Sequence, residues 1–136
     1  MFRRFLRRSR QQRGQSLVEF TLVVPLLLLS LVGISDLGRV MYYYVAISNA
    51  SVEGSRQASN PLSTDTDIRN AVHDEASPLI EIAFGDIMIT PTPIRTEGQP
   101  VSVTVVYRFA AVTPLVNRMW SGGSLNIQSS TTMMVQ

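Results

Sequence analysis

One uncharged apolar run limits what this chain can fold into. Residues 20–35 read FTLVVPLLLLSLVGIS and hold no charged side chain. A helix that packs against a soluble core keeps one polar face, whereas this run is apolar on every side. Extended back to Leu17, it supplies the ~20 residues that a membrane-spanning helix needs. The sequence therefore predicts one helix that crosses a membrane.

The charges on either side of the run predict its orientation. Residues 1–14 hold six arginines and no acidic residue, whereas the chain from Gln15 onward holds six arginines against ten acidic residues, a formal charge of −4. By the positive-inside rule, the basic end stays in the cytoplasm and the chain beyond about residue 36 is exported. The same arginines would contact anionic lipid headgroups. They are Arg3, Arg4, Arg7, Arg8, Arg10 and Arg13.

A basic start also occurs in three kinds of segment that fit this sequence less well. A nucleic-acid-binding arm would grip phosphates with its arginines, but the apolar run behind it indicates a membrane, so we expect no nucleic-acid partner. A cleaved secretory signal needs a small-x-small pattern directly after the run, and SDLGRVMYYY at residues 35–44 has none. A twin-arginine export signal fails because RRFL has the wrong spacing and lies too far upstream.

Composition and spacing exclude several kinds of chemistry. Without cysteine the chain forms no disulfide, thiolate metal site or cysteine nucleophile, and its single histidine, His73, cannot build a multi-histidine metal site. His73 and Asp74 are neighbours on a predicted helix, where adjacent side chains do not face each other. DTDIRN starts like a calcium loop but places Arg69 where an oxygen ligand is needed. Gly122-Gly123 lacks the Lys-Ser/Thr of a phosphate loop. We therefore expect a non-enzymatic protein with no catalytic residue, metal or cofactor.

Helical patterning continues beyond the membrane edge. From Asp36 to about Ala58 there is no proline, and Asp36 and Arg39 are spaced to pair on one helix face. Three tyrosines at 42–44 would form an aromatic belt at the outer interface. Residues 17–59 thus read as one long helix, half inside the membrane and half outside it.

Small side chains recur every four residues in the outer half of this helix. Such a ridge lets another backbone approach closely. Two interpretations stay open with equal weight: the ridge receives a helix of another subunit, or it receives the chain's own domain. The residues are Ala46, Ala50, Gly54 and Ala58.

The rest of the chain predicts a small α+β head. Asn60-Pro61 ends the long helix, and Thr64 or Asp65 can cap a second, short helix from about Asp65 to Ala76. The apolar piece LIEIAF at residues 79–84 fits either a helix extension or a strand.

Sheet signals fill the last third of the chain. VSVTVVYRF at residues 101–109 alternates, with its apolar side chains on one face. LNIQSSTTMMV at 125–135 reads as a final strand, and the prolines in DIMITPTPI at 86–94 place it at a sheet edge. TPLVNRMW at 113–120 predicts one or two helical turns, and its apolar side chains either cover the core or contact another subunit. We expect a two- to three-stranded antiparallel sheet packed on the long helix.

A single carboxylate lies inside the first turns of the apolar run. Glu19 near the centre of a bilayer would cost on the order of 2.5–3.5 kcal/mol, and less toward the interface. Such a residue calls for a named partner. A cut after Gly14 would make Gln15 a new N-terminus, whose ammonium lies one helical turn from Glu19. The pairing could be within one subunit or between two, and a glutamate that simply snorkels to the cytoplasmic interface is the plainer alternative.

The stretch RGQSLVEF, followed by VVPLLLLSLVGISDLGR, resembles the TadE-like minor pseudopilins of tight-adherence (Flp) type IV pilus systems. Their processing pattern is a glycine, four residues and then Glu-Phe, which Gly14, Glu19 and Phe20 match. The similarity extends through residues 35–39 and 47–59, and it returns at 107–116 and 127–136. The tail departs from it, because such proteins often end in an acidic residue and this chain ends in Gln136.

The resemblance implies a maturation step and a set of partners. A prepilin peptidase would cut between Gly14 and Gln15 on the cytoplasmic side, where a residue without a Cβ lets the backbone lie extended in the protease cleft. Glu19 and Phe20 would serve recognition and assembly. The further partners implied are other pilin or pseudopilin subunits and a pilus assembly platform in the bacterial inner membrane.

These inferences divide the chain into three parts. Residues 1–14 form a basic cytoplasmic leader that is cleaved, residues 15–59 form a long helix that spans the membrane to about residue 35, and residues 60–136 form an extracytoplasmic head. A subunit of this kind would either assist assembly from the membrane or enter the fibre. The competing function is an uncleaved, signal-anchored envelope protein whose head binds a ligand or a partner protein.

Overall fold

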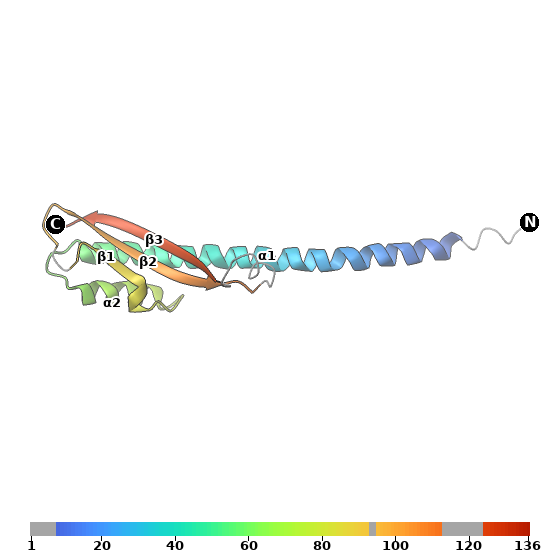
Figure 1. Ribbon diagram of the computed structural model, residues 1–136, viewed down its shortest axis with the longest axis horizontal. Coiled ribbons are helices and arrows are strands. Elements are labelled where there is room, and N and C mark those ends of the chain that lie inside the picture. Colours follow the sequence, from blue (N-terminus) through green and yellow to red (C-terminus); the bar gives the residue numbers. More distant parts are fainter. Residues whose placement is uncertain (1–7, 93–94, 113–123) are drawn as a thin grey trace, which may run out of the picture.

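The computed structural model describes residues 8–92, 95–112 and 124–136. One long helix, α1 (Arg8–Ala58), runs the length of the molecule. Its second half carries everything else, and its first half projects alone (Figure 1). The predicted α+β class, with a long N-terminal helix and a small head, is confirmed.

Helix α1 begins earlier than predicted. It passes through Gly14 without a break and already includes the leader from Arg8. Arginine and glutamine are good helix formers, and one glycine costs only about 1 kcal/mol of helix propensity. That cost is too small to end a helix that extends for many turns beyond it. Pro25 also lies inside α1.

The second helix, α2 (Asp65–Ala76), begins and ends where the sequence predicted. Thr64 is its N-cap: the Thr64 hydroxyl accepts from the Asp67 backbone N–H, and the Asp67 carboxylate accepts from the Thr64 backbone N–H. This reciprocal capping box satisfies two donors at the start of the helix. Ile68 and Val72 form its buried stripe, and both are fully buried.

Three antiparallel strands follow in the order β1-β2-β3: β1 (Ile87–Thr90), β2 (Pro100–Ala110) and β3 (Ser124–Met134). The central strand places Val103 opposite Ile89 on β1 and opposite Thr131 on β3. β1 is a short edge strand that ends before Pro91, as the prolines predicted.

The segment that the sequence left unassigned is neither a helix extension nor a strand of the sheet. Ile80 and Ile82 are buried there, and the chain then makes a single 3-10 turn, η1 (Phe84–Asp86), before β1. Two buried residues spaced two apart are too short a signal to distinguish a strand from a bridge across the core.

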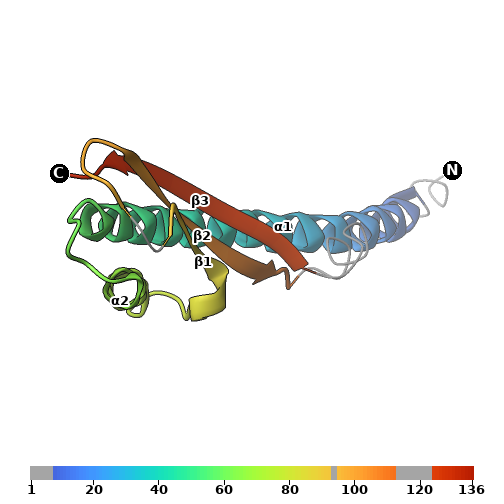
Figure 2. The same ribbon diagram turned by 60° about the vertical axis from the view of Figure 1, so that its left-hand side comes forward.

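The core lies between α1, α2 and one face of the sheet. The sheet and α2 both lie alongside the outer half of α1 (Figures 1 and 2). The alternating face of β2 points inward as predicted, with Val101, Val103, Val105 and Phe109 buried and Tyr107 half-buried. The outer half of α1 is therefore part of the head, whereas the predicted division of the chain began the head at residue 60.

Candidate functional site

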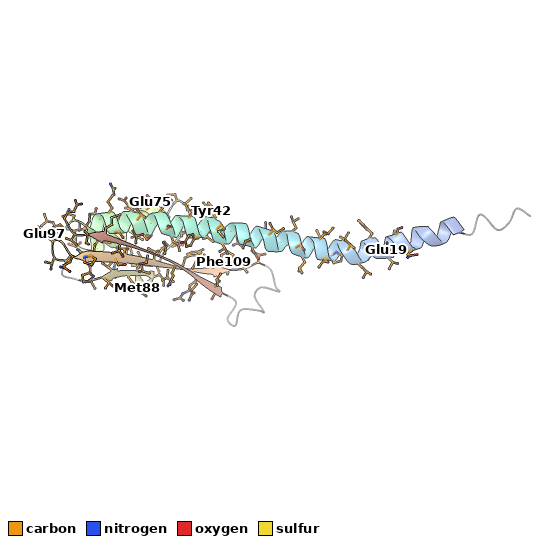
Figure 3. The ribbon with its side chains drawn as sticks, turned by 90° about the horizontal axis from the view of Figure 1, so that it is seen from above. Glu19, Tyr42, Glu75, Met88, Glu97 and Phe109 are labelled. Atoms are coloured by element: carbon orange, nitrogen blue, oxygen red, sulfur yellow. The ribbon has the colours of Figure 1, made fainter. Side chains whose placement is uncertain are left out.

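The predicted processing motif lies on the free-standing half of α1. Gly14, Gln15, Glu19 and Phe20 are all exposed, and Glu19 projects from the helix far from the head (Figure 3). The Gln15 side-chain amide donates to the Glu19 carboxylate at 3.4 Å. The pair is spaced by four residues, so it lies on one helix face. The motif therefore lies well away from the head and is open to an approaching protein.

Gly14 is not required by the packing of this chain. A Cβ built at Gly14 would meet no atom within 4 Å, and the same holds for Gly33 and Gly38 on the same helix. Glycine costs about 1 kcal/mol relative to alanine in a helix interior. Glycine at position 14 therefore lowers the stability of the helix, and no contact at its Cβ position explains why a glycine is there.

The free-standing half of α1 exposes a continuous apolar surface. By length and composition this helix is able to cross a membrane, and none of its most apolar stretch is buried in the protein. Two of its hydroxyls bond to the helix's own backbone: Thr21 donates to the Leu17 carbonyl at 2.7 Å and Ser30 to the Leu26 carbonyl at 2.9 Å. Exposed side chains on this half include Leu17, Phe20, Leu22, Leu26, Leu27, Leu28, Leu31 and Ile34.

The small-residue stripe lies inside the head. The buried Gly54 faces α2 and β2: a Cβ there would overlap the Val72 side chain and approach the Val103 Cγ1 to 3.1 Å. The stripe thus receives the chain's own sheet and second helix, which is the second of the two interpretations that the sequence left open. Its other members, Ala46, Ala50 and Ala58, are also buried.

A second ridge of small residues on α1 was missed from the sequence. The Ser51 hydroxyl lies 2.8 Å from the Thr131 hydroxyl and 3.2 Å from that of Ser129, and the Ser55 hydroxyl donates to the Thr131 backbone carbonyl at 2.8 Å. Both α1 serines are fully buried. Their spacing with Ile47 repeats every four residues, and that periodicity was the signal available. These hydroxyls join α1 to the edge strand β3.

Asp36 joins the segment that follows β2 to the middle of α1. Its side chain is buried, and one of its carboxylate oxygens accepts from the Arg39 guanidinium at 3.1 Å and from the Val112 backbone N–H at 3.2 Å. The predicted Asp36–Arg39 pair is therefore confirmed. The contact with Val112, 76 positions away, could not be read from the sequence.

An aromatic cluster lies directly above this contact. The Tyr43 ring centroid is 5.0 Å from that of Tyr107 and 5.7 Å from that of Phe109, and the Arg39 guanidinium lies 5.2 Å from the Phe109 ring centre. Burial raises the pKa of Tyr107. Tyr42, in contrast, points outward (Figure 3). Tyr43, one of the three tyrosines predicted as an interfacial belt, is thus drawn into the head's own packing.

Two arginines tie loops to α2. Arg95 donates to the Asp65 carboxylate at 2.6 Å and to the Ser63 carbonyl. Hydrogen bonds from Thr92 and then Arg95 lower the pKa of Asp65. Arg69, which ruled out the calcium loop, donates to the Ile87 carbonyl at 2.6 Å and to the Phe84 carbonyl. These arginines act as structural clamps.

The described part of the chain holds no cluster of side chains suited to a metal ion. Across residues 8–92, 95–112 and 124–136, no three His, Cys, Asp or Glu side chains are placed to hold a metal ion. The His73 ring lies 5.7 Å from that of Phe84. Arg3, Arg4, Arg7, the predicted turns at 113–120 and the glycine pair lie outside the described residues.

Comparison with protein families gives one match, over the free half of α1 and most of its packed half. The model of the TadE-like protein family matches residues 14–56. This segment is TadE-like. The match starts at Gly14, and over this segment it agrees with the family that the glycine and Glu-Phe spacing indicated. No curated protein and no solved structure matches the chain. TadE-like proteins are structural, pilus-related proteins, and the match supports a membrane-anchored protein of that kind.

Proposed function

We propose that this protein is a minor pseudopilin-like subunit, processed by a prepilin peptidase, that acts in assembly of a tight-adherence type IV pilus. The observation that carries the proposal is the start of the TadE-like match at Gly14, at the start of the free-standing apolar stretch of α1 that carries one carboxylate, Glu19. The leader arginines would keep the N-terminus in the cytoplasm, with the helix in the inner membrane and the head outside.

The environment of Gly14 supports cleavage after it. Proteases bind their substrates extended, and α1 is continuous through Gly14 and Gln15, so the peptidase must open a turn of helix. Glycine makes that opening cheaper by about 1 kcal/mol. Because no contact within the chain needs a glycine at this position, its role is assigned to the peptidase.

Cleavage would change what the start of the helix can bind. In the uncut chain, the first N–H groups after Gly14 bond to carbonyls of the leader, four residues back. Removing the leader leaves the backbone N–H groups of residues 16–18 without helix partners, beside a new ammonium on Gln15. A Glu19 carboxylate is a matching acceptor. Since Glu19 lies exposed on the lipid-facing half, the carboxylate of a neighbouring subunit can reach such an N-terminus and set the register between subunits.

Two measurements test the proposal. Mass spectrometry of the mature protein should find Gln15 as the first residue, and Gly14→Val should block the cut. Gly33→Val is the matched control, because a Cβ at that glycine also meets nothing within 4 Å and the position lies outside the motif. An intact Met1 in the wild-type membrane protein would instead favour the uncleaved, signal-anchored envelope protein whose head binds a ligand.

Glu19 is tested separately from cleavage. Glu19→Gln keeps the size and hydrogen-bonding ability of the side chain but removes its charge, and breaking a buried ion pair costs about 3–5 kcal/mol. We expect this variant to be processed and membrane-bound but to yield few pili. Pilus numbers equal to wild type would contradict the pairing of Glu19 with a neighbouring N-terminus.

A further inference from the structure

The length of the membrane span fixes the height of the head. From Leu17 to Asp36 there are 19 helical steps, or about 29 Å at ~1.5 Å per residue. The hydrocarbon core of a bilayer is about 30 Å thick. A helix that crosses it along this stretch places Asp36 at the outer boundary of the hydrocarbon.

The head reaches down to that boundary. Asp36 accepts from the Val112 backbone N–H at 3.2 Å, so the end of β2 lies at the same level as the last turn of the span. No spacer separates the described part of the head from the membrane at this point. The headgroup layer is about 5–7 Å thick on each side, which corresponds to about three to five helical residues. Residues 36–40 and Val112 therefore fall within it.

The side chains exposed at this level suit a lipid interface. Val112 is 67% exposed and Leu37 is 60% exposed, and both are apolar. Two residues beyond Leu37 along the helix, and so farther from the acyl chains, the Arg39 side chain is 40% exposed. Its guanidinium lies by the Tyr43 and Phe109 rings, which leaves part of the group outward. Segments that lie in a lipid interface place apolar side chains toward the acyl chains and a cation at the level of the phosphates. The three side chains have this arrangement.

We propose that Leu37, Arg39 and Val112, here called the base of the head, form a membrane-contact surface seated in the phospholipid headgroups of the outer leaflet. The occupant is the lipid surface rather than a second subunit, because the base is continuous with the membrane-spanning surface of α1. The base holds the head upright against the bilayer through Asp36. This contact does not depend on cleavage after Gly14 and goes beyond the proposed function.

The absence of cysteine from the sequence makes a direct test simple. A single Val112→Cys substitution carries an environment-sensitive NBD label in the full, uncleaved chain, reconstituted in vesicles of phosphatidylethanolamine and phosphatidylglycerol. Leu62→Cys is the matched control: it is 89% exposed and follows the far end of α1, roughly 33 Å along the helix from Asp36 at ~1.5 Å per residue. Both positions are exposed, so neither label displaces core packing.

The expected result is a blue-shifted emission at position 112 that is quenched by spin-labelled lipid, with water-like emission and little quenching at position 62. Equal quenching at the two positions would overturn the proposal. Tenfold dilution of the protein in lipid distinguishes lipid from a second subunit as the occupant. If lipid covers position 112, its blue-shifted emission persists on dilution. If the emission becomes water-like, the surface contacts another subunit and the proposal of lipid contact is overturned. Resistance of each labelled protein to protease shows that the head is folded.

Discussion

Replacing Gly54 by alanine should destabilise the head, against the ordinary expectation for a helix. In a helix interior, alanine is more favourable than glycine by about 1 kcal/mol. At Gly54, however, the added methyl would overlap the Val72 side chain and press on the Val103 Cγ1 at 3.1 Å. Both valines are fully buried and, being β-branched, are stiff about χ1, so neither can turn away cheaply.

The balance of the two effects gives the expected magnitude. Overfilling a packed core typically costs about 1–3 kcal/mol. Because two stiff, buried side chains must shift here, the cost should lie in the upper part of that range. After the gain in helix propensity, Gly54→Ala should lower the free energy of unfolding of the head by roughly 1–2 kcal/mol.

Pulse proteolysis in urea, on the full chain in detergent micelles, measures this change. Gly38→Ala is the control, because a Cβ at Gly38 meets nothing within 4 Å, and it should not destabilise the head. Val72→Ala removes the methyl groups that the new Cβ would strike. The double variant Gly54→Ala/Val72→Ala should therefore be more stable than the sum of the single effects predicts. A Gly54→Ala protein as stable as Gly38→Ala would refute the close packing of α1 against α2 and β2.

Three further predictions concern the stability of the head. Ser55→Val should remove the hydroxyl that donates to a β3 carbonyl and lower the free energy of unfolding by about 1–3 kcal/mol. Asn49→Ala, at an exposed position of the same helix, is the control and should change that free energy little. Urea titration of both variants measures the difference. Thr64→Ala removes the N-cap of α2 and should cost about 1 kcal/mol, seen as a lower urea midpoint. Since the pKa of Asp65 is lowered in the folded protein, its contribution is complete above the ordinary aspartate pKa of about 3.9 and is lost as pH falls from that value through the lower folded pKa. Thr92→Val should reduce this acid sensitivity, and an unchanged pH profile of stability would contradict the role of that hydrogen bond.

Much of the fold follows from local patterns in the sequence. The alternation in residues 101–109 places side chains on two faces of one strand, and the core is on the side it indicated. Thr64 is read as a cap because its hydroxyl and the Asp67 carboxylate are three residues apart, which is the spacing of the capping box. The membrane helix is evident because a single apolar segment can satisfy its backbone in lipid only as a helix.

What the sequence could not reveal depends on contacts between distant segments. Asp36 meets Val112, and Ser51 meets Ser129 and Thr131, across more than seventy positions. Polar side chains of this kind add nothing to an apolar pattern. The four-residue spacing of the serines with Ile47 is a local signal of a buried face, but it does not indicate which distant residues they contact. The predicted processing motif at Gly14 is the opposite case: its spacing is readable in the sequence, while no contact at the Cβ position of Gly14 requires a glycine there.

The small-residue stripe shows why location decides its role. Sequence spacing alone allowed it to receive a neighbouring subunit or the chain's own domain, and Val72 and Val103 occupy the space next to Gly54. A substitution in the stripe should therefore act through unfolding of the head rather than through a lost subunit contact. If the protein assembles as proposed, contacts between subunits within the membrane would fall to the exposed apolar half of α1. Shape alone specifies register poorly on that nearly uniform surface, so in the proposed assembly the charge of Glu19 is the feature that would fix one subunit against the next.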